Sequence, residues 1–332
     1  MSKATIRIAG IAAGILVAGA ALAGCSNTPS SPTQPADSGP VAANIVIGTG
    51  GQLSNADIFL GISQGLFEKQ GLTAKTQILT AGSDAVPLLL KGDLNFATVD
   101  MGTAINATQQ NIGITTVAPN TVGVPGKIGY AGIVAGGDSG IDRPADLEGK
   151  KVQVNQLGGT AQVLTAASIV KDGGDPSKVQ WVEIAPPEAI PALQGGQVDA
   201  IVVGEPLTTI ALGMGFKYVF NPEETTVPGL PTFVFVTSTA YAKQNPKVVE
   251  EFQTAILAAN AAANADPDAL RETAKTSTTV DPALLAQVKG LPVFGEDPIT
   301  GKQVQKYIDF LVKYGSVDKS ATPKGAAVVW AP

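Results

Sequence analysis

The fold is decided by residues 146–207, which read DLEGKKVQVNQLGGTAQVLTAASIVKDGGDPSKVQWVEIAPPEAIPALQGGQVDAIVVGEPL. Short runs of β-branched residues alternate here with runs of helical period. Residues 151–155 predict a buried strand, and apolar residues then recur at helical spacing from Val163 to Val170 until two glycines end the helix. The stretch therefore opens with a strand, a tight glycine turn and a helix.

A second unit of the same kind follows without a break. Residues 179–184 predict a strand, Pro186 and Pro187 fit the start of a helix over 189–194, and residues 199–203 predict the next strand. Parallel strands joined by right-handed helical crossovers place their connecting turns along one edge of a sheet. Because α/β proteins bind small molecules at that edge, we expect the binding site there.

The same pattern occurs earlier in the chain. Residues 86–99 align with residues 190–203 at an offset of 104, with Pro, Leu, Gly and the apolar positions matched. Residues 50–54 and 158–162 pair near the same offset. An offset this long predicts two similar α/β lobes rather than a short repeat. The alternative is that any two strand–helix units share such a pattern by chance.

Composition narrows the classes of function. A chain of 332 residues suggests about two domains. Charged residues make up 15%, the net charge is −6 and no basic patch is present, which argues against a nucleic-acid partner. Histidine is absent and Cys25 is the single cysteine, which excludes His-dependent triads, Cys/His metal sites and disulfides within the chain. A carboxylate-only metal site stays open on composition, but we expect no metal, no cofactor and no catalytic residue.

The N-terminus has the layout of a secretory signal. Lys3 and Arg7 precede an apolar run over residues 8–22. Residues 22–25, Leu-Ala-Gly-Cys, resemble a bacterial lipobox, which implies cleavage after residue 24 and a lipid on Cys25. A transmembrane helix is the alternative, but the run is shorter than the ~20 residues that a membrane span needs.

The next segment contains almost nothing that can be buried. Residues 26–43 are rich in Ser, Thr, Pro and Asp. We therefore predict a signal peptide over residues 1–24 and a lipidated N-terminus with a disordered linker over 25–43. The folded part would then be extracytoplasmic and anchored to the cell membrane by its lipid.

The remaining elements predict how the lobes are connected. Strands are expected at 45–47, 75–79, 95–99, 115–119 and 217–220, and Ser54 or Asn55 is the expected N-cap of the first helix. Residues 130–135 predict a strand that crosses into the second lobe, and residues 232–237 predict the return. The helices after Thr239 should pack on the first lobe. Lobe 1 would then comprise residues 44–129 and 232–332, lobe 2 would comprise residues 130–231, and the two crossings would form a hinge with a cleft.

Five segments in order resemble one family. They are residues 65–72 (GLFEKQGL), 138–141 (DSGI), 146–152 (DLEGKKV), 192–200 (ALQGGQVDA) and 205–206 (EP). Together they resemble the extracytoplasmic substrate-binding proteins of ABC importers, in the nitrate/sulfonate/taurine group that also includes binders of thiamine-precursor pyrimidines and aromatic acids.

The resemblance covers residues 44 to about 312 and carries several implications. The fold would be of the two-lobed type II periplasmic-binding class, each lobe a mostly parallel sheet flanked by helices with the ligand between them. The protein would be a monomer that delivers a small-molecule ligand to a permease, which a cytoplasmic ATPase drives. No residue of this chain forms an ATPase phosphate loop, because its glycine-rich turns lack the Gly-Lys-Ser/Thr ending.

Four turns are expected to face the cleft, at residues 52–55, 100–103, 158–161 and 204–207. Three of them precede helices whose free N–H groups can hold an anionic or polar group. Single Ser and Thr residues there have ordinary helix capping as the alternative role. Asp100 and Glu205 would bind either a ligand amine or ring N–H, or backbone amides. The residues predicted to bind ligand are Gln52, Leu53, Ser54, Asn55, Ser83, Asp100, Met101, Gly102, Thr103, Gly159, Thr160, Ala161 and Glu205.

The residue types in the sequence limit the chemistry of the ligand only in part. The mature chain has two arginines, Arg143 and Arg271, and both are expected outside the site. An anion would rely on helix termini and hydroxyls, whereas an acidic cleft would favour a neutral or amine-bearing solute. A nitrate site is disfavoured because histidine is absent. Core packing is favoured over ring stacking on the ligand for Phe59, Trp181 and Phe233.

The predicted function is therefore the solute-binding component of an ABC importer. The solute would be a small polar organic molecule, either sulfonate-like or taurine-like, or pyrimidine-like or an aromatic acid. One alternative is a ligand-sensing lipoprotein that transports nothing. Another is a pyrimidine-synthesis enzyme on the same fold, but the family pattern for that reading needs histidine or cysteine chemistry that this chain lacks.

Overall fold

The computed structural model describes residues 42–79, 84–124, 131–155, 157–278, 280–314 and 322–331. The chain divides into two units, Met1–Gly39 and Pro40–Pro332, and every described residue belongs to the second. The expected signal peptide, Cys25, nearly all of the linker and Ser83 lie outside the described residues. What the sequence predicts for them stays a prediction.

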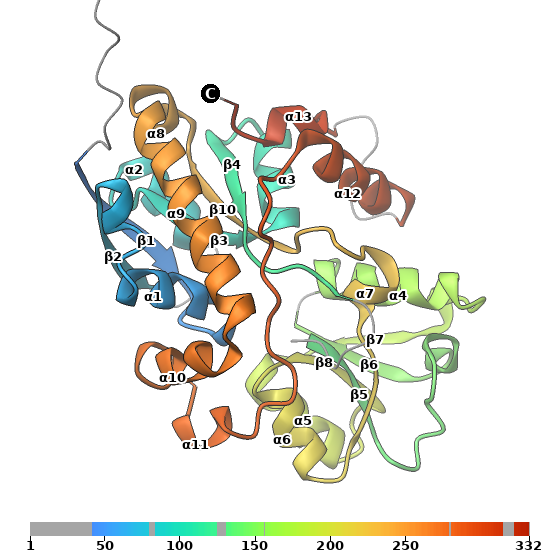
Figure 1. Cartoon of the computed structure of the whole chain (residues 1–332). Coiled ribbons are helices and arrows are strands. Elements are labelled where there is room, and N and C mark those ends of the chain that lie inside the picture. Colours follow the sequence, from blue (N-terminus) through green and yellow to red (C-terminus); the bar gives the residue numbers. More distant parts are fainter. Residues whose placement is uncertain are drawn as a thin grey trace, which may run out of the picture. The chain divides into compact units, whose positions relative to one another are not determined.

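The first sheet has five strands in the order β2-β1-β3-β10-β4. Strands β1 and β3 pair in parallel, as do β1 and β2, whereas β10 runs antiparallel to both of its neighbours. We refer to this sheet and the helices on it as lobe 1 (Figure 1). Its strands are β1 (Ala43–Thr49), β2 (Leu72–Ile78), β3 (Phe96–Asp100), β4 (Ile114–Pro119) and β10 (Phe233–Ser238).

The second sheet repeats this order as β7-β6-β8-β5-β9. Here β5 is the antiparallel strand, in the place that β10 has in lobe 1. The two segments aligned at an offset of 104 thus supply β3 and β8, which occupy equivalent positions in their sheets. We refer to this sheet and its helices as lobe 2. Its strands are β5 (Ala131–Ala135), β6 (Lys151–Val154), β7 (Gln180–Glu183), β8 (Ala200–Gly204) and β9 (Lys217–Phe220).

Helices flank both sheets, which confirms the predicted α/β class, and each sheet is mixed because one of its strands runs antiparallel to both neighbours. Within the described ranges, no helix combines the length and the apolar composition that a bilayer span requires. The helices are α1 (Ala56–Ser63), α2 (Ala85–Lys91), α3 (Met101–Gln109), α4 (Thr160–Lys171), α5 (Pro186–Gln194), α6 (Leu207–Gly213), α7 (Pro222–Thr226), α8 (Thr239–Gln244), α9 (Pro246–Ala265), α10 (Pro267–Ser277), α11 (Pro282–Leu285), α12 (Gly301–Lys313) and α13 (Gly325–Val328).

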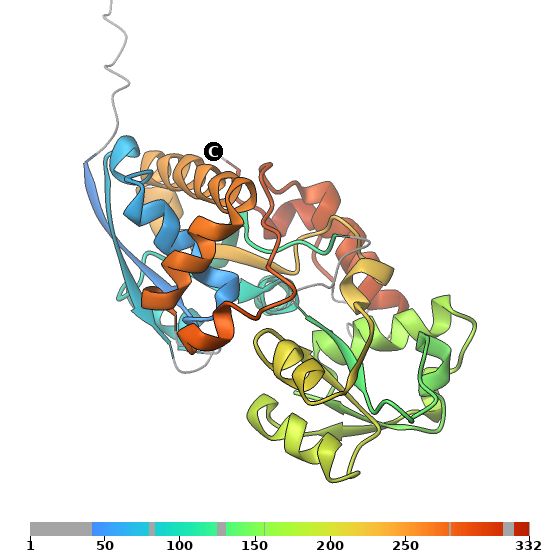
Figure 2. The same cartoon turned by 60° about the horizontal axis from the view of Figure 1, so that its bottom comes forward.

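The core of lobe 1 joins residues from both ends of the chain. Phe252 of α9 stacks on Phe96 of β3, with ring centroids 3.7 Å apart and planes 5° from parallel. Phe235 of β10 meets the same Phe252 ring edge-on at 5.6 Å. Helix α9 shares one apolar cluster with β1, β3, β4 and β10, so it packs across one face of this sheet (Figures 1 and 2). Helix α9 therefore packs on lobe 1, as predicted for the helices after Thr239.

The two segments that cross between the lobes lie side by side. The Thr232 N–H donates to the Thr121 carbonyl at 3.0 Å, and Val122 and Pro231 form an antiparallel bridge. The hydroxyls of Thr121 and Thr232 are 3.3 Å apart. This paired connection is the geometry expected of a hinge.

Helix α12 departs from the simple assignment to lobe 1. Its buried side chains Tyr307, Ile308 and Leu311 share one apolar cluster with Val163 and Leu164 of α4, which belongs to lobe 2. The sequence pattern showed the apolar stripe of this helix but not that the stripe faces both lobes.

Candidate ligand-binding site

The first turn of α3 is built around Asp100. Strand β3 ends at this residue, whose extended backbone makes it the N-cap of the helix. Its carboxylate accepts the N–H of Thr103 at 3.0 Å and also the Thr103 hydroxyl. Asp is among the residues that cap helices best, because a carboxylate satisfies free N–H groups at the positive helix end. The next N–H, that of Met101, donates to the Thr232 carbonyl at 2.9 Å, which ties this turn to the hinge.

The first turn of α4 faces this turn from lobe 2. Gly158 has φ +72°, a conformation that favours glycine, and Gly159 is the N-cap. The Thr160 hydroxyl donates to Asp100 Oδ1 across the lobes at 3.4 Å. A Cβ on Gly102 would lie 3.0 Å from Asp100 Oδ1 and 3.1 Å from Thr160 Oγ1, so glycine permits this approach. The structure thus brings together two of the four predicted turns.

Three of the four residues of the turn at residues 52–55 are buried. Gln52 is exposed, whereas Leu53 is part of an apolar core cluster and Ser54 is buried. Asn55 occupies the N-cap position of α1 without capping it, since its amide donates to Thr98 Oγ1 at 3.3 Å. Asn55 is therefore the N-cap of α1 by position, as expected, but its side chain makes no capping hydrogen bond, because the amide bonds to β3 instead.

Glu205 is only 5% exposed, and its carboxylate is occupied by protein donors. Oε2 accepts the Thr209 N–H at 3.0 Å, and Oε1 accepts the Thr209 hydroxyl at 2.9 Å and the Gly290 N–H at 3.0 Å. Of the two roles left open by the sequence, the contacts match the bonding to backbone amides. Glu205 thereby joins α6 of lobe 2 to the segment that follows α11.

Two titratable residues, one in α7 and one in α12, were not anticipated from the sequence. Burial raises the pKa of the Glu223 carboxyl in α7 to about 7, and the Thr232 hydroxyl is its hydrogen-bonding partner. Tyr307 of α12 is 1% exposed, and the carboxyls of Asp100 and Glu223 act on its hydroxyl electrostatically. Burial also raises the pKa of Tyr307, so its hydroxyl stays protonated. In the sequence, Tyr307 was only one of the apolar positions that recur at helical spacing. No sequence pattern pointed to Glu223.

The other groups considered from the sequence lie elsewhere. Arg143 Nε pairs with Asp172 Oδ2 at 2.7 Å, and Arg271 donates to the carbonyls of Leu285 and Val288, so both arginines lie outside the cluster around Asp100. Trp181 packs against the core of lobe 2. Across the part of the chain that the structure describes, no group of three or more His, Cys, Asp or Glu side chains is arranged to hold a metal ion.

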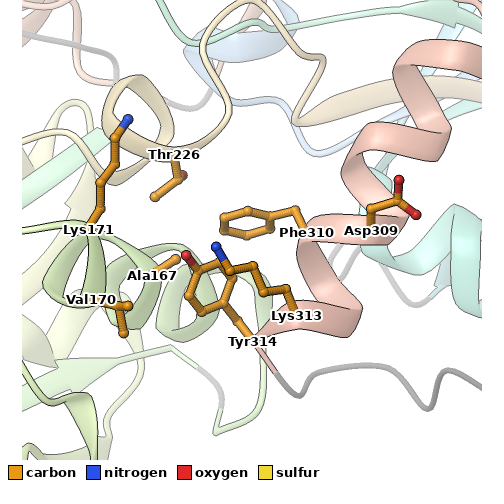
Figure 3. Close-up of a pocket in the computed structure, with 8 residues that line it drawn as sticks. All are labelled: Ala167, Val170, Lys171, Thr226, Asp309, Phe310, Lys313 and Tyr314. Atoms are coloured by element: carbon orange, nitrogen blue, oxygen red, sulfur yellow. The ribbon is translucent and has the colours of Figure 1, made fainter.

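A cavity of about 540 Å³ lies further along the same helices (Figure 3). Phe310 and Tyr314 project into it from α12, and their ring centroids are 4.9 Å apart. Phe310 follows Tyr307 by one helical turn, but neither Tyr307 nor Asp100 lines this cavity. Its lining residues are Ala167, Val170 and Lys171 of α4, Thr226 of α7, and Asp309, Phe310, Lys313 and Tyr314 at α12.

Comparison with known proteins places this architecture in a family. The family model described as NMT1/THI5 like matches residues 52–270, which is more than half of the chain. The chain belongs to the NMT1/THI5-like family. A curated relative of this NMT1/THI5-like chain is the taurine-binding periplasmic protein of Escherichia coli (strain K12), 27% identical over 202 residues. That match covers 60% of this chain and 61% of the relative, which is less than two thirds of the relative's length.

Solved structures with the same fold include two sulfonate-binding proteins. The periplasmic aliphatic sulphonate binding protein of Escherichia coli has a TM-score of 0.70 and 19% identity, covering 86% of this NMT1/THI5-like chain and 97% of its own. The alkanesulfonate-binding protein of Xanthomonas axonopodis pv. citri, bound to MOPS, has a TM-score of 0.66 and 19% identity, covering 88% and 99%. At this identity the likeness establishes the periplasmic-binding fold. The curated relative and both of these neighbours are binding proteins rather than enzymes.

Proposed function

We propose that this protein is the solute-binding component of an ABC importer. It binds a small polar organic solute between its lobes and delivers it unchanged to a membrane permease, which a cytoplasmic ATPase drives. The observation that carries the proposal is the meeting of two helix N-termini, at Asp100 and Thr160, from lobes that are joined by a paired hinge. Family membership and the taurine-binding relative support the same function.

The arrangement suits reversible binding without chemistry. A solute between the two turns contacts both lobes, so it stabilises the closed arrangement relative to any open one. The N–H groups and hydroxyls of the two turns can orient polar groups of the solute.

Thermal unfolding tests this function directly. The purified protein would be heated with taurine, alkanesulfonates, nitrate, aminopyrimidines and aromatic carboxylates in turn. A solute at ~100 times its dissociation constant should stabilise the fold by about 2.7 kcal/mol, which raises Tm measurably. Recovery of that solute unchanged after incubation would support a receptor, whereas its conversion to product would favour an enzyme.

Uptake separates import from sensing. Cells would be given the labelled solute, with and without the gene for this protein. Solute accumulation that depends on the gene supports the importer function. Binding to the purified protein without any effect of the gene on uptake would instead favour a ligand-sensing lipoprotein.

We further propose that Cys25 carries the lipid that anchors the protein outside the cell membrane. The motif at residues 22–25 supports this. Replacing Cys25 by Ala should move the protein from the membrane fraction to the soluble fraction of lysed cells. A Ser26→Ala variant serves as the control, and Cys25→Ala protein that stays in the membrane fraction would rule out the lipid anchor.

A further inference from the structure

The cavity of about 540 Å³ between α4, α7 and α12 takes no part in the proposed solute site. Its volume lies within the roughly 300–1,000 Å³ of typical small-molecule pockets. The side chains that line it come from the second half of α4, the end of α7 and the end of α12 (Figure 3). Ala167, the first of them on α4, follows Thr160 by about two helical turns, or about 10 Å. The cavity is therefore separate from the turns at Asp100 and Thr160, and it has room for a second ligand.

Part of the cavity wall is apolar and accessible. Val170 on α4 is 41% exposed, and Phe310 and Tyr314 project into the cavity from α12 (Figure 3). The two rings have centroids 4.9 Å apart and planes 48° from parallel. A third aromatic ring can pack beside such a pair, and it would remove exposed apolar surface of Val170 from water. This wall thus favours a ligand with an aromatic ring.

Two lysines flank the apolar wall. Lys171 Nζ, on α4, donates to the Thr225 carbonyl at 2.6 Å, which uses one of its three N–H donors. Lys313 Nζ, on α12, lies 5.2 Å from the centroid of the Tyr314 ring. Within the described ranges, the ion pairs at 4 Å or less involve other lysines and Arg143, so no carboxylate there neutralises Lys171 or Lys313.

Asp309 is the acidic residue of the lining, and it does not cancel this positive charge. Its Oδ1 accepts a hydrogen bond from Gln305 Nε2 at 2.8 Å, which holds the carboxylate beside the previous turn of α12. In Figure 3 the carboxylate points away from the Phe310 ring. Two lysines and one aspartate leave the lining with a net charge of +1. An anion is therefore attracted to the cavity, whereas a cation is repelled.

We propose that this cavity binds an aromatic monoanion, with its ring against Val170, Phe310 and Tyr314 and its negative group next to Lys171 and Lys313. An aromatic carboxylate and an aromatic sulfonate share this chemistry. The ligand would touch α4 of lobe 2 and also α12, whose buried side chains pack on both lobes. The site is distinct from the proposed solute site between α3 and α4, and it does not depend on an importer function.

Titration calorimetry with matched probes tests the chemistry. The purified protein would be titrated with naphthalene-1-sulfonate and 1-naphthoate, which carry a ring and a negative charge. It would also be titrated with 1-naphthylmethylammonium, which has the ring and the opposite charge, and with hexane-1-sulfonate, which has the negative charge without the ring. We expect at least one naphthyl anion to bind, and the other two kinds of probe to bind in the cavity at least ~10-fold more weakly.

Charge variants locate the binding. Replacing both lysines, Lys171→Gln with Lys313→Gln, should weaken binding of the naphthyl anion ~10-fold or more, because the lining then repels it. The matched control is Lys302→Gln with Lys306→Gln, which removes the same charge from exposed positions of α12 outside the lining. Salt screens such remote charges, so the affinity of the control should stay within about two-fold.

A second variant tests the wall while both lysines stay in place. Val170→Glu adds a negative charge at a position that is already 41% exposed, so it should weaken anion binding ~10-fold or more with little change in Tm. Val170→Gln, which has the same size without the charge, should retain most of the affinity. The Tm of each variant without probe, measured in parallel, separates lost binding from lost folding.

The outcomes decide whether the cavity is a site. Binding of a naphthyl anion that is lost in the double lysine variant and in Val170→Glu, but kept in both controls, would support the proposal. Three results would overturn it: no binding of either naphthyl anion up to ~1 mM, equal binding of the naphthyl cation, or binding that every variant retains. The last result would place the probe elsewhere on the protein. None of these results bears on import, which the uptake experiment tests separately.

Discussion

Asp57 is an acid buried against an amide with no cation near it. It is fully buried, and its Oδ2 accepts from Asn120 Nδ2 at 3.1 Å. The remaining side-chain oxygens of both residues, the two Oδ1 atoms, have no partner. The protonated acid suits this environment, because burial without a cation disfavours the charged carboxylate. Burial accordingly raises the pKa of Asp57 to about 8.

Stability should therefore depend on pH through Asp57. The unfolded chain releases this proton near pH 4, whereas the folded chain keeps it up to about pH 8. The free energy of unfolding should fall as pH rises between these values, by up to about 1.4 kcal/mol per unit, and level off above pH 8. Glu223, with a pKa of about 7, should likewise lower the free energy of unfolding as pH rises, and its contribution should level off above about pH 7.

Asp57→Asn isolates this contribution. Urea unfolding from pH 5 to pH 9 should show a shallower decline in stability for the variant than for the natural protein. Asp138→Asn, at an exposed position, should decline as the natural protein does. Parallel curves for Asp57→Asn and the natural protein would show that Asp57 is ionised in the fold.

Glu205 is expected to act through structure. Its carboxylate accepts three hydrogen bonds, and truncation leaves the N–H groups of Thr209 and Gly290 without their acceptor. Glu205→Ala should lower the free energy of unfolding by about 2–3 kcal/mol, because unpaired buried donors cost roughly that much. Glu188→Ala, at an exposed position in α5, is the matched control. If Glu205→Ala retained full stability and lost only solute binding, Glu205 would instead be a ligand contact.

At the scale of elements, α12 and α13 touch without an intervening side chain. A Cβ on Gly325 would lie 2.2 Å from the Gly301 carbonyl oxygen and 2.5 Å from the Gln305 nitrogen. Both atoms belong to the backbone of α12, so no side-chain rotation relieves the contact. This close packing holds the C-terminal segment next to β4, where the Trp330 N–H donates to the Thr116 carbonyl at 2.8 Å.

Gly325→Ala should therefore separate the two helices. We expect a loss of about 1–3 kcal/mol in urea unfolding, the usual effect of overpacking. Gly213→Ala is the control, because a Cβ in that last turn of α6 meets nothing within 4 Å. The control should be neutral or up to about 1 kcal/mol more stable, since alanine favours helix over glycine. Equal stability of the two variants would contradict the close packing.

The elements themselves were largely predictable. Strands such as β9, and the βα units that contain α4 and α5, follow from hydrophobic period and from glycines and prolines at their ends. The capping role of Asp100 follows from its place between a strand and a helix. The role of Asn55 did not follow, because its amide bonds to Thr98, and which strand lies beside a helix is not encoded locally. Glu223 and Tyr307 were missed for the same reason.

At the scale of the whole molecule, the approach of the lobes depends on Gly102. A Cβ added to Gly102 would come into close contact with both Asp100 Oδ1 and Thr160 Oγ1. Gly102→Val should keep the lobes further apart and weaken solute binding at least ~10-fold, with little change in Tm without solute. Gly137→Val, at an exposed turn of lobe 2, is the matched control. Calorimetry with whichever solute raises Tm measures the effect, and unchanged affinity would show that binding does not need this approach.

The position of β10 also determines the order in which the molecule can be completed. A ribosome makes β1 to β4 first, but β10, which separates β3 from β4, is made only after all five strands of lobe 2. Lobe 2 has its full sheet once Phe220 has emerged from the ribosome. The sheet of lobe 1 lacks β10 until Ser238 has emerged. A nascent chain halted between these two residues would hold a complete lobe 2 and an incomplete lobe 1, so the half of the protein that is synthesised first finishes folding last.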